Sequence, residues 1–235
     1  MLGGKSYFLL IYIILISNVS SQKVVPKITV YFESLCPYSI EFITTSIKEF
    51  YSKVTKPNVA YIELIPYGNA KETYDPTTKK YTFTCQHGDN ECYGNLVSTC
   101  SLNVLGRVEG QLNIICLLEN IYLHNRNFDE TLEYCMSSKP ELLKEVQDCV
   151  KSDIGNIYEH QMAEKTGDHL GVPWILVDGV YDEEDNEIIY DSLFEFLCGE
   201  DKSKCLWNIK IKNVYKINKY LTFIYLNLDN KFIDY

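Results

Sequence analysis

Cys36 is the residue of this 235-residue chain whose type and position best suit chemistry. It stands in the segment Cys36-Pro37-Tyr38-Ser39, where a predicted strand meets a helix that Pro37 can begin without losing a hydrogen bond. The free N–H groups and the dipole of a helix N-terminus favour the thiolate, which is the form of cysteine that attacks disulfides. We therefore interpret Cys36 as a nucleophile. The alternatives are an inert buried thiol or one half of an intermolecular disulfide.

Ser39 occupies the position at which a second cysteine would release the product in a Cys-x-x-Cys motif. Three residues apart along a helix, the two side chains share one face. A serine hydroxyl can donate a hydrogen bond to the Cys36 thiolate, but it does not attack sulfur at a useful rate. Three outcomes stay open: resolution by a small external thiol such as glutathione or cysteine, isomerisation in which a thiol of the substrate releases Cys36, or no turnover.

The other eight cysteines are candidates for structural disulfides. Lys5, an apolar run over residues 7–16 and small residues up to position 21 predict a secretory signal peptide over residues 1–21. The oxidising secretory route favours paired cysteines, and nine is an odd number, so one cysteine is left over. The sequence does not decide how the other eight pair. They are Cys85, Cys92, Cys100, Cys116, Cys135, Cys149, Cys198 and Cys205.

The formal net charge of -10 argues against nucleic-acid binding, which usually requires a basic face. After the signal peptide no apolar run is long enough to span a bilayer, so no membrane span is predicted in the mature chain. No cofactor is predicted apart from an external low-molecular-weight thiol as the reductant. The sequence indicates no oligomeric state.

A strand, a helix and a second strand are predicted around Cys36. Residues 27–34 alternate apolar and polar side chains, and residues 59–66 form a second β-rich run. Between them an apolar helical stripe ends before Pro57. A right-handed crossover makes the two strands parallel. The stripe consists of Ile40, Ile43, Ile47 and Phe50.

The remainder of the domain is predicted as a loop, a helical block, a hairpin and a short helix. Residues 68–84 carry turn residues and are expected to be a loop. Residues 90–154 are mostly helical in pattern, and residues 171–180 contain an Asp-Gly pair between apolar runs, which is typical of a β-hairpin. The acidic run at residues 182–187 is expected to be a solvated surface loop, followed by a short helix over residues 192–198.

A zinc site is one interpretation of a compact cluster of three cysteines and a histidine, since both residue types are zinc ligands. The spacing fits no common zinc module, and disulfides are favoured in a secreted chain, so no metal site is predicted. His87 is then expected to have a structural role, and Glu91 and Asn95 to cap or orient their loop. The cluster comprises Cys85, His87, Cys92 and Cys100.

The same segment resembles the signature of the gamma-interferon-inducible lysosomal thiol reductase (GILT) family, CQHG-x2-EC-x2-N-x4-C, at every fixed position. Three further blocks, VYFESLCPYS, LIPYGNAKE and VPWILVDG, resemble that family, so that the similarity covers about residues 27–200. The resemblance implies an α/β, thioredoxin-like (DsbA-like) sheet with a disulfide-stapled helical insertion. We expect this domain over residues 22–205, followed by a C-terminal extension over residues 206–235 to which no structure is assigned.

The resemblance also implies which residues meet the substrate. Thioredoxin-like proteins carry a cis-proline opposite the active cysteine, and Val172-Pro173 resembles that position. Cys36 and Ser39 form a Cys-x-x-Ser variant of the family's catalytic motif. Substrate binding is expected of Pro37, Tyr38, Val172 and Pro173.

The resulting hypothesis is a secreted or lysosome-like thiol–disulfide oxidoreductase that reduces or isomerises protein disulfides through Cys36 and is resolved by an external thiol. Its partners are disulfide-containing proteins. The alternative is a catalytically weak or inactive GILT-like module, which holds extended polypeptides by strand pairing or traps partners as mixed disulfides. A purely structural secreted protein is a third class, and it predicts that Cys36 is inaccessible.

Overall fold

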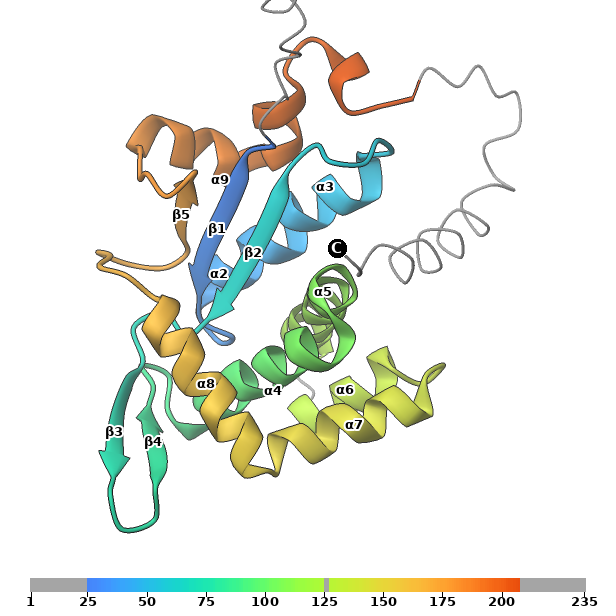
Figure 1. The fold of residues 1–235 in the computed structure, drawn as a ribbon. Helices are drawn as coiled ribbons and strands as arrows, with labels where there is room; N and C mark the ends of the chain where they lie inside the picture. The colour runs from blue at the N-terminus through green and yellow to red at the C-terminus, as the bar shows by residue number, and fades with distance from the viewer. Residues whose placement is uncertain (1–24, 125–126, 208–235) are drawn as a thin grey trace, which may run out of the picture.

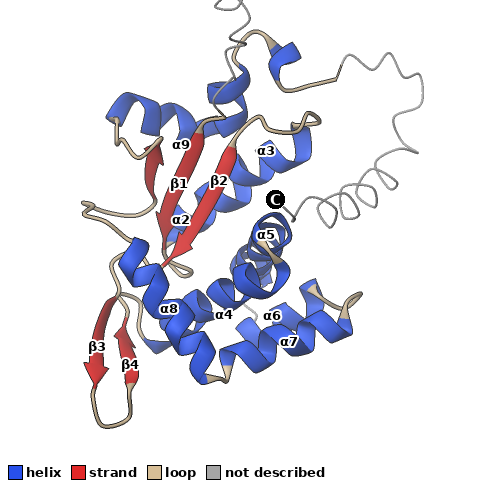
Figure 2. Ribbon diagram, viewed as in Figure 1, coloured by secondary structure: helices blue, strands red, loops and turns tan. Residues whose placement is uncertain are grey.

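The computed structural model of the chain describes residues 25–124 and 127–207 (Figure 1). The predicted signal peptide lies outside the described residues, and so does the predicted C-terminal extension apart from Leu206 and Trp207. Within the described part, three strands form a mixed sheet beside a block of helices, and two further strands form a separate hairpin (Figure 2).

The sheet has the strand order β2-β1-β5, with β1 (Lys27–Phe32) in the centre. Strand β2 (Tyr61–Pro66) pairs with β1 in parallel, and β5 (Trp174–Val177) pairs with it in the antiparallel direction. The predicted parallel pairing is therefore confirmed. Because helices cover both faces, β1 is buried over most of its length, as a central strand in such a sheet must be.

The predicted helix after Cys36 is confirmed as one helical run. It consists of α2 (Pro37–Phe42), the π-helical segment η1 (Ile43–Ile47) and α3 (Lys48–Lys53). Its apolar stripe packs on one face of the sheet together with side chains of α5 (Arg107–His124) and α9 (Glu183–Cys198). Helix α8 (Asp153–Lys165) lies over the opposite face, where Met162 packs near Tyr31 and Ile65.

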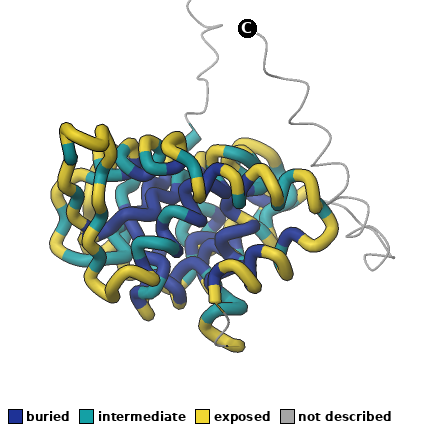
Figure 3. Tube along the Cα trace, turned by 90° about the horizontal axis from the view of Figure 1, so that it is seen from below, coloured by how far each residue is buried: buried dark blue, intermediate teal, exposed yellow. Residues whose placement is uncertain are grey.

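The predicted helical block is confirmed and is longer than the sequence pattern indicated. It consists of α4 (Asp89–Leu105), α5 (Arg107–His124), α6 (Phe128–Cys135), α7 (Pro140–Val150) and α8 (Asp153–Lys165). A second apolar core lies inside this block. Buried segments gather in the middle of the molecule and exposed ones around its edge (Figure 3).

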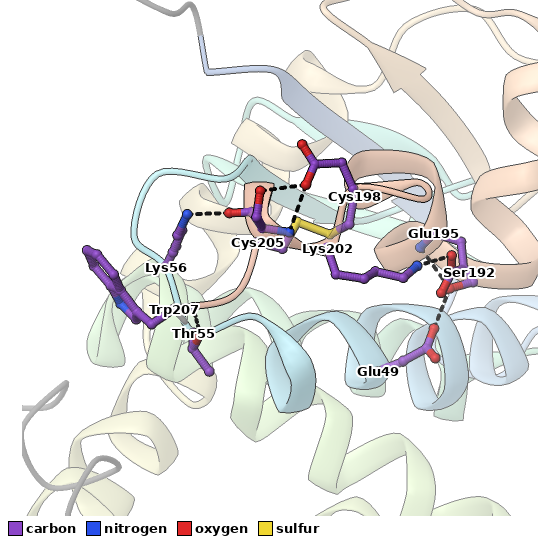
Figure 4. Close-up of a disulfide and its surroundings, with 11 residues drawn as sticks. Glu49, Thr55, Lys56, Ser192, Glu195, Cys198, Lys202, Cys205 and Trp207 are labelled. Atoms are coloured by element: carbon purple, nitrogen blue, oxygen red, sulfur yellow. Dashed lines mark hydrogen bonds and ion pairs between the residues drawn. A yellow bond between two sulfur atoms is a disulfide. The ribbon is translucent and has the colours of Figure 1, made fainter. Parts of the chain in front are cut away.

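Eight cysteines form four disulfides, as the odd count predicted. Cys100–Cys149 joins α4 to α7, and Cys116–Cys135 joins α5 to α6. Cys85–Cys92 joins a loop to the first turn of α4. Cys198–Cys205 joins the end of α9 to the 3-10 segment η2 (Lys202–Lys204), and this corner lies against the end of α3 (Figure 4).

Two predictions about surface segments are wrong. Residues 68–84 are not simply a loop, because they include the hairpin of β3 (Lys71–Asp75) and β4 (Lys80–Thr84). Asp75 and Pro76 lie at the hairpin tip, where the Thr77 N–H donates to the Asp75 carboxylate at 2.8 Å, whereas Gly68 and Asn69 form a turn before β3. Few apolar side chains mark these strands because most of their residues are at least partly exposed, which weakens the strand pattern.

The segment after β5 also differs from its prediction. The Asp-Gly turn exists, with positive φ at Asp178 (50°) and Gly179 (83°), but the second strand is a single bridge between Val177 and Val180. The acidic run is not a loop: it begins helix α9 (Glu183–Cys198), with the Asp182 carboxylate accepting from the Asp185 N–H at 3.0 Å. Acidic side chains are favourable at a helix N-terminus, which explains their concentration there.

The α/β class is thus confirmed. None of the helices in residues 25–124 and 127–207 combines the length and the apolar character that crossing a membrane requires.

Candidate active site

Cys36 is the one cysteine without a disulfide partner, and all nine cysteines lie within the described residues. It is the N-cap residue of α2, with extended backbone (φ -66°, ψ 120°). The residue is buried, at 7 % exposure, and its sulfur lies 3.7 Å from the carbonyl oxygen of Val172, within the reach of a weak S–H donor. The sequence therefore identified both the unpaired cysteine and its place at the start of a helix.

Cys36 lines a pocket of about 530 Å³, which gives its sulfur a route to solvent. Four segments form the wall: the start of α2, the two loops on either side of the β3–β4 hairpin, and the loop before β5. The wall residues are Cys36, Pro37, Tyr38, Asn69, Gln86, His87, Leu170, Gly171 and Val172.

Among the four predicted substrate-binding residues, Pro37, Tyr38 and Val172 line this pocket. Pro173 is not part of the wall but follows Val172 through a cis peptide bond, which confirms the predicted isomer. The sequence analysis missed Leu170, which is 95 % exposed and joins the 67 % exposed Tyr38 at the pocket. No local pattern marks Leu170, since it comes to Cys36 only through the fold.

Ser39 is fully buried and is held at the end of strand β1. Its hydroxyl oxygen accepts a hydrogen bond from the Glu33 N–H at 3.4 Å. Among the described residues, no hydrogen bond joins Ser39 to the sulfur of Cys36. The hydroxyl thus stabilises the strand-to-helix junction in this structure, and the bond that it could donate to Cys36 is not among the described contacts.

The family signature fixes the junction from the side of α4. The Asn95 side chain accepts from the Ser34 N–H at 2.9 Å, and the Ser34 hydroxyl donates to the carbonyl oxygen of Glu91 at 3.0 Å. Helix α4 comes this close because Gly94 has no side chain: a Cβ there would lie 2.4 Å from the Ser34 hydroxyl. Asn95 and Glu91 therefore hold the chain that leads to Cys36, a larger role than the loop capping predicted for them.

His87 is placed by Glu91 one turn along the chain. The Glu91 carboxylate accepts from the His87 N–H at 2.9 Å and contacts the ring Nδ1 at 2.6 Å. The carboxylate of Glu33 lies 3.6 Å from the same Nδ1. The zinc interpretation of the cysteine cluster is excluded, because Cys85 is bonded to Cys92 and Cys100 to Cys149.

Glu33 and Glu91 are both fully buried. Burial raises the pKa of Glu33, and the nearby carboxylate of Glu91 raises it further, while the hydrogen bond from the Asn69 N–H opposes the shift. Gly68 packs against this side chain with a positive φ of 58°, and a Cβ there would lie 2.5 Å from the Glu33 Cγ. These contacts hold the carboxylate next to the pocket wall.

A mixed three-stranded sheet, a disulfide-stapled helical block and one free cysteine at a helix start define an α/β protein with a thiol site. The family model described as "Gamma interferon inducible lysosomal thiol reductase (GILT)" matches residues 27–153. The chain belongs to this family, as its signature predicted.

Individual relatives agree with this assignment. The chain is 32% identical over 216 residues to the "Gamma-interferon-inducible lysosomal thiol reductase" of Carassius auratus, covering 81% of this chain and 76% of that protein. The protein of the same name in Mus musculus is 31% identical over 156 residues, 65% of this chain and 60% of that protein. The "Gamma-interferon-responsive lysosomal thiol protein" of Arabidopsis thaliana is 27% identical over 182 residues, covering 76% and 72%.

Proposed function

We propose that this protein is a thiol–disulfide oxidoreductase that reduces or isomerises protein disulfides through the single nucleophile Cys36. One observation carries the proposal: Cys36 alone is unpaired among nine cysteines, and it lines an open pocket. The names of the curated relatives support the same chemistry. The reaction needs Cys36 as a thiolate, the form of cysteine that attacks disulfides.

In the first step the Cys36 thiolate attacks one sulfur of a substrate disulfide. A new S–S bond joins Cys36 to the substrate, and the second substrate sulfur leaves as a thiolate that takes a proton from solvent. The carbonyl oxygen of Val172, 3.7 Å from the Cys36 sulfur, accepts a weak hydrogen bond from the thiol in the resting state and so holds the sulfur at the pocket wall.

Release then requires sulfur from outside the enzyme, because Ser39 supplies none. An external thiolate attacks the Cys36 sulfur and displaces the substrate as its thiolate. A second external thiol removes the first from Cys36 as a small disulfide. In sum, two molecules of glutathione or cysteine become one disulfide, and one substrate disulfide becomes two thiols.

Isomerisation needs no external electrons. Another thiolate of the same substrate attacks the substrate sulfur of the mixed disulfide, forms a new substrate disulfide and expels Cys36 as a thiolate. The number of disulfides is unchanged. Both routes share the first step, and the concentration of external thiol selects between them.

The substrate is an extended segment of a disulfide-containing protein. Pro37, Tyr38 and Val172 contact it in the pocket, and the backbone beside Pro173 pairs with it as thioredoxin-like proteins do with theirs. The central βαβ order followed by a helical block and an antiparallel strand is compatible with a thioredoxin-like, DsbA-like sheet. The working compartment is secretory or lysosome-like, where four disulfides persist.

A second candidate function follows from the burial and hydrogen bonding of Ser39. Its buried hydroxyl bonds to the Glu33 N–H, and no second sulfur lies at the motif. A site of this kind holds extended polypeptides or traps them as mixed disulfides when no external thiol reaches the pocket. The same assay separates the two functions.

The test is the reduction of a protein disulfide by the purified chain in excess cysteine or glutathione. We expect turnover above the uncatalysed rate that is lost in Cys36→Ala. Equal rates for the wild type and Cys36→Ala contradict the mechanism. Mixed disulfides at Cys36 without turnover in excess thiol favour the binding module.

A further inference from the structure

Three side chains beside the pocket are not used by the reaction proposed above: Glu33 on the segment after β1, and His87 and Glu91 around the start of α4. Both carboxylates are fully buried, although a buried charge is costly unless it is paired. We call this group the Glu33–His87–Glu91 cluster. The geometry of this cluster suits a bound cation.

Each carboxylate has one oxygen held by the backbone and one oxygen directed at the same ring nitrogen. Glu33 Oε1 accepts from the Asn69 N–H at 2.7 Å, and Glu91 Oε1 accepts from the His87 N–H at 2.9 Å. The remaining oxygens, both Oε2, lie 3.6 Å and 2.6 Å from His87 Nδ1. Three potential ligand atoms therefore converge, while backbone donors fix the carboxylates that carry two of them.

Glu33 Oε2 has no hydrogen-bond partner among the described residues, and its side chain is only 1% exposed. At 3.6 Å, His87 Nδ1 is too far away to donate a normal hydrogen bond to it. A buried carboxylate oxygen without a partner is rare in proteins and calls for an explanation. A bound cation supplies one.

We propose that Glu33 Oε2, Glu91 Oε2 and His87 Nδ1 bind one divalent transition-metal ion such as Zn²⁺. The three ligand atoms lie within 4.8 Å of one another, and ligands at about 2.0–2.2 Å from one zinc ion are themselves about 3–3.5 Å apart. Binding requires that the 2.6 Å Nδ1–Oε2 contact of His87 and Glu91 lengthens and that the wider separations close to this range. Two carboxylates balance the charge of the ion, and an N/O donor set suits zinc, manganese or iron.

The surroundings provide support and access for such an ion. Backbone N–H groups orient both carboxylates, which is the usual second layer of a metal site. The Cys85–Cys92 disulfide anchors the loop that carries His87. The His87 side chain is 35% exposed and lines the pocket, so the ion can enter there, and water can complete its coordination.

A second histidine of the same chain provides a matched control. His160 contacts Glu72 through Nδ1 at 2.8 Å and lies 3.7 Å from Glu164 through Nε2. These carboxylates face opposite nitrogens of the ring, so one ion cannot bind both together with a ring nitrogen. The residue types match those of the Glu33–His87–Glu91 cluster, but the convergence is missing.

The experiment is a calorimetric titration with Zn²⁺ at neutral pH in a Cys36→Ala background, which removes the free thiol as a competing ligand. We expect one Zn²⁺ per chain. Glu33→Gln should weaken this binding by at least about tenfold, in line with the loss of metal-site residues, and Glu72→Gln should leave it unchanged. Zn²⁺ should also raise the melting temperature of the parent and of Glu72→Gln, but not of Glu33→Gln.

His87→Asn serves as the second variant in case Glu33→Gln does not fold, because His87 is at the surface of the cluster. It should likewise weaken binding, with an unchanged circular dichroism spectrum as the check on folding. Absence of saturable Zn²⁺ binding, or equal binding by the parent and both variants, overturns the proposal. Neither result bears on disulfide reduction through Cys36.

Discussion

Ser39 is the residue at which this chain differs most from a two-cysteine reductase. It occupies the third position of α2, three residues after the N-cap Cys36, so that a side chain there shares the face of the nucleophile. Because Ser39 is fully buried, an external thiol cannot reach Cys36 through the position of Ser39. In the proposed mechanism the resolving thiol therefore enters through the pocket, so turnover is expected to depend on its concentration.

Ser39→Cys should restore an internal resolving group. We expect turnover at low external thiol to rise on the order of tenfold or more, because an intramolecular thiol replaces a dilute bimolecular one. The measurement is the rate of protein-disulfide reduction as a function of cysteine concentration.

Ser39→Ala is the control, since it removes the hydroxyl without adding sulfur. It should keep the rate of the wild type while it loses about 1 kcal/mol of stability with the hydrogen bond from Glu33. If Ser39→Cys turns over no faster than Ser39→Ala, the site does not allow the second sulfur to reach Cys36.

Tyr38 tests whether the exposed pocket residues bind polypeptide. Tyr38→Ala should raise KM for a protein disulfide about fivefold, the effect of roughly 1 kcal/mol, but leave the reduction of a small disulfide unchanged. Tyr122→Ala is the matched control, because Tyr122 is 68% exposed against 67% for Tyr38 and does not line the pocket. Equal effects of both substitutions would remove Tyr38 from the binding site.

The sequence could predict Cys36 because one residue type, one motif and an odd count agree. It could not predict the wall residues Asn69 and Leu170, which meet Cys36 only after four segments fold together. The proximity of Glu33 to His87 was equally hidden, since the two residues belong to different blocks of the sequence. Contacts of this kind depend on tertiary packing and carry no local pattern.

At the scale of elements, the disulfides divide into one beside the pocket and three away from it. Cys85–Cys92 closes the loop that supplies Gln86 and His87 to the pocket wall. Cys198–Cys205 closes a loop of the same sequence separation, 7 residues, at the corner between α9 and α3. The two bonds form a natural matched pair.

Replacing both cysteines of either bond by serine should cost a similar stability, about 2–3 kcal/mol by the loop-entropy model. Only the loss of Cys85–Cys92 should also lower kcat/KM, because it frees a part of the pocket wall. The measurements are denaturant unfolding and steady-state reduction for both double variants. A comparable loss of kcat/KM from the Cys198–Cys205 pair would show that the effect is one of general stability.

The strands and helices were predictable where one face is buried, because burial gives their apolar residues a regular spacing. The strands at β1 and β2 and the helical stripe after Pro37 are buried on a defined face, and each was predicted correctly. The β3–β4 hairpin was missed because its strands are half exposed, and the start of α9 because acidic caps resemble a solvated loop in sequence.

At the scale of the whole molecule, a buried carboxyl makes stability depend on pH. Glu159 in α8 is almost fully buried, accepts a hydrogen bond from the Thr99 hydroxyl at 2.6 Å, and has its pKa raised by burial to about 8. From about pH 4.5, the ordinary pKa of a glutamate, up to about pH 8 the Glu159 carboxyl of the folded state holds a proton that the unfolded state has lost. The free energy of unfolding therefore falls as the pH rises through this window.

Glu159→Gln should flatten this dependence, because the amide carries no charge at any pH. Between about pH 5 and pH 8 the free energy of unfolding of the wild type should fall, relative to that of Glu159→Gln, by at most on the order of 5 kcal/mol. Glu164→Gln, on the same helix but exposed, should keep the wild-type slope. Denaturant unfolding at several pH values measures both, and parallel slopes for the wild type and Glu159→Gln would contradict the assignment.

The most direct test of the central claim is the alkylation of the native protein followed by peptide mapping of all nine cysteines. We predict that, without denaturant, the reagent labels Cys36 alone. The other eight cysteines should be recovered as the disulfides Cys85–Cys92, Cys100–Cys149, Cys116–Cys135 and Cys198–Cys205. A Cys36 that reacts only after unfolding, or that is recovered in a disulfide of the resting protein, would contradict the account.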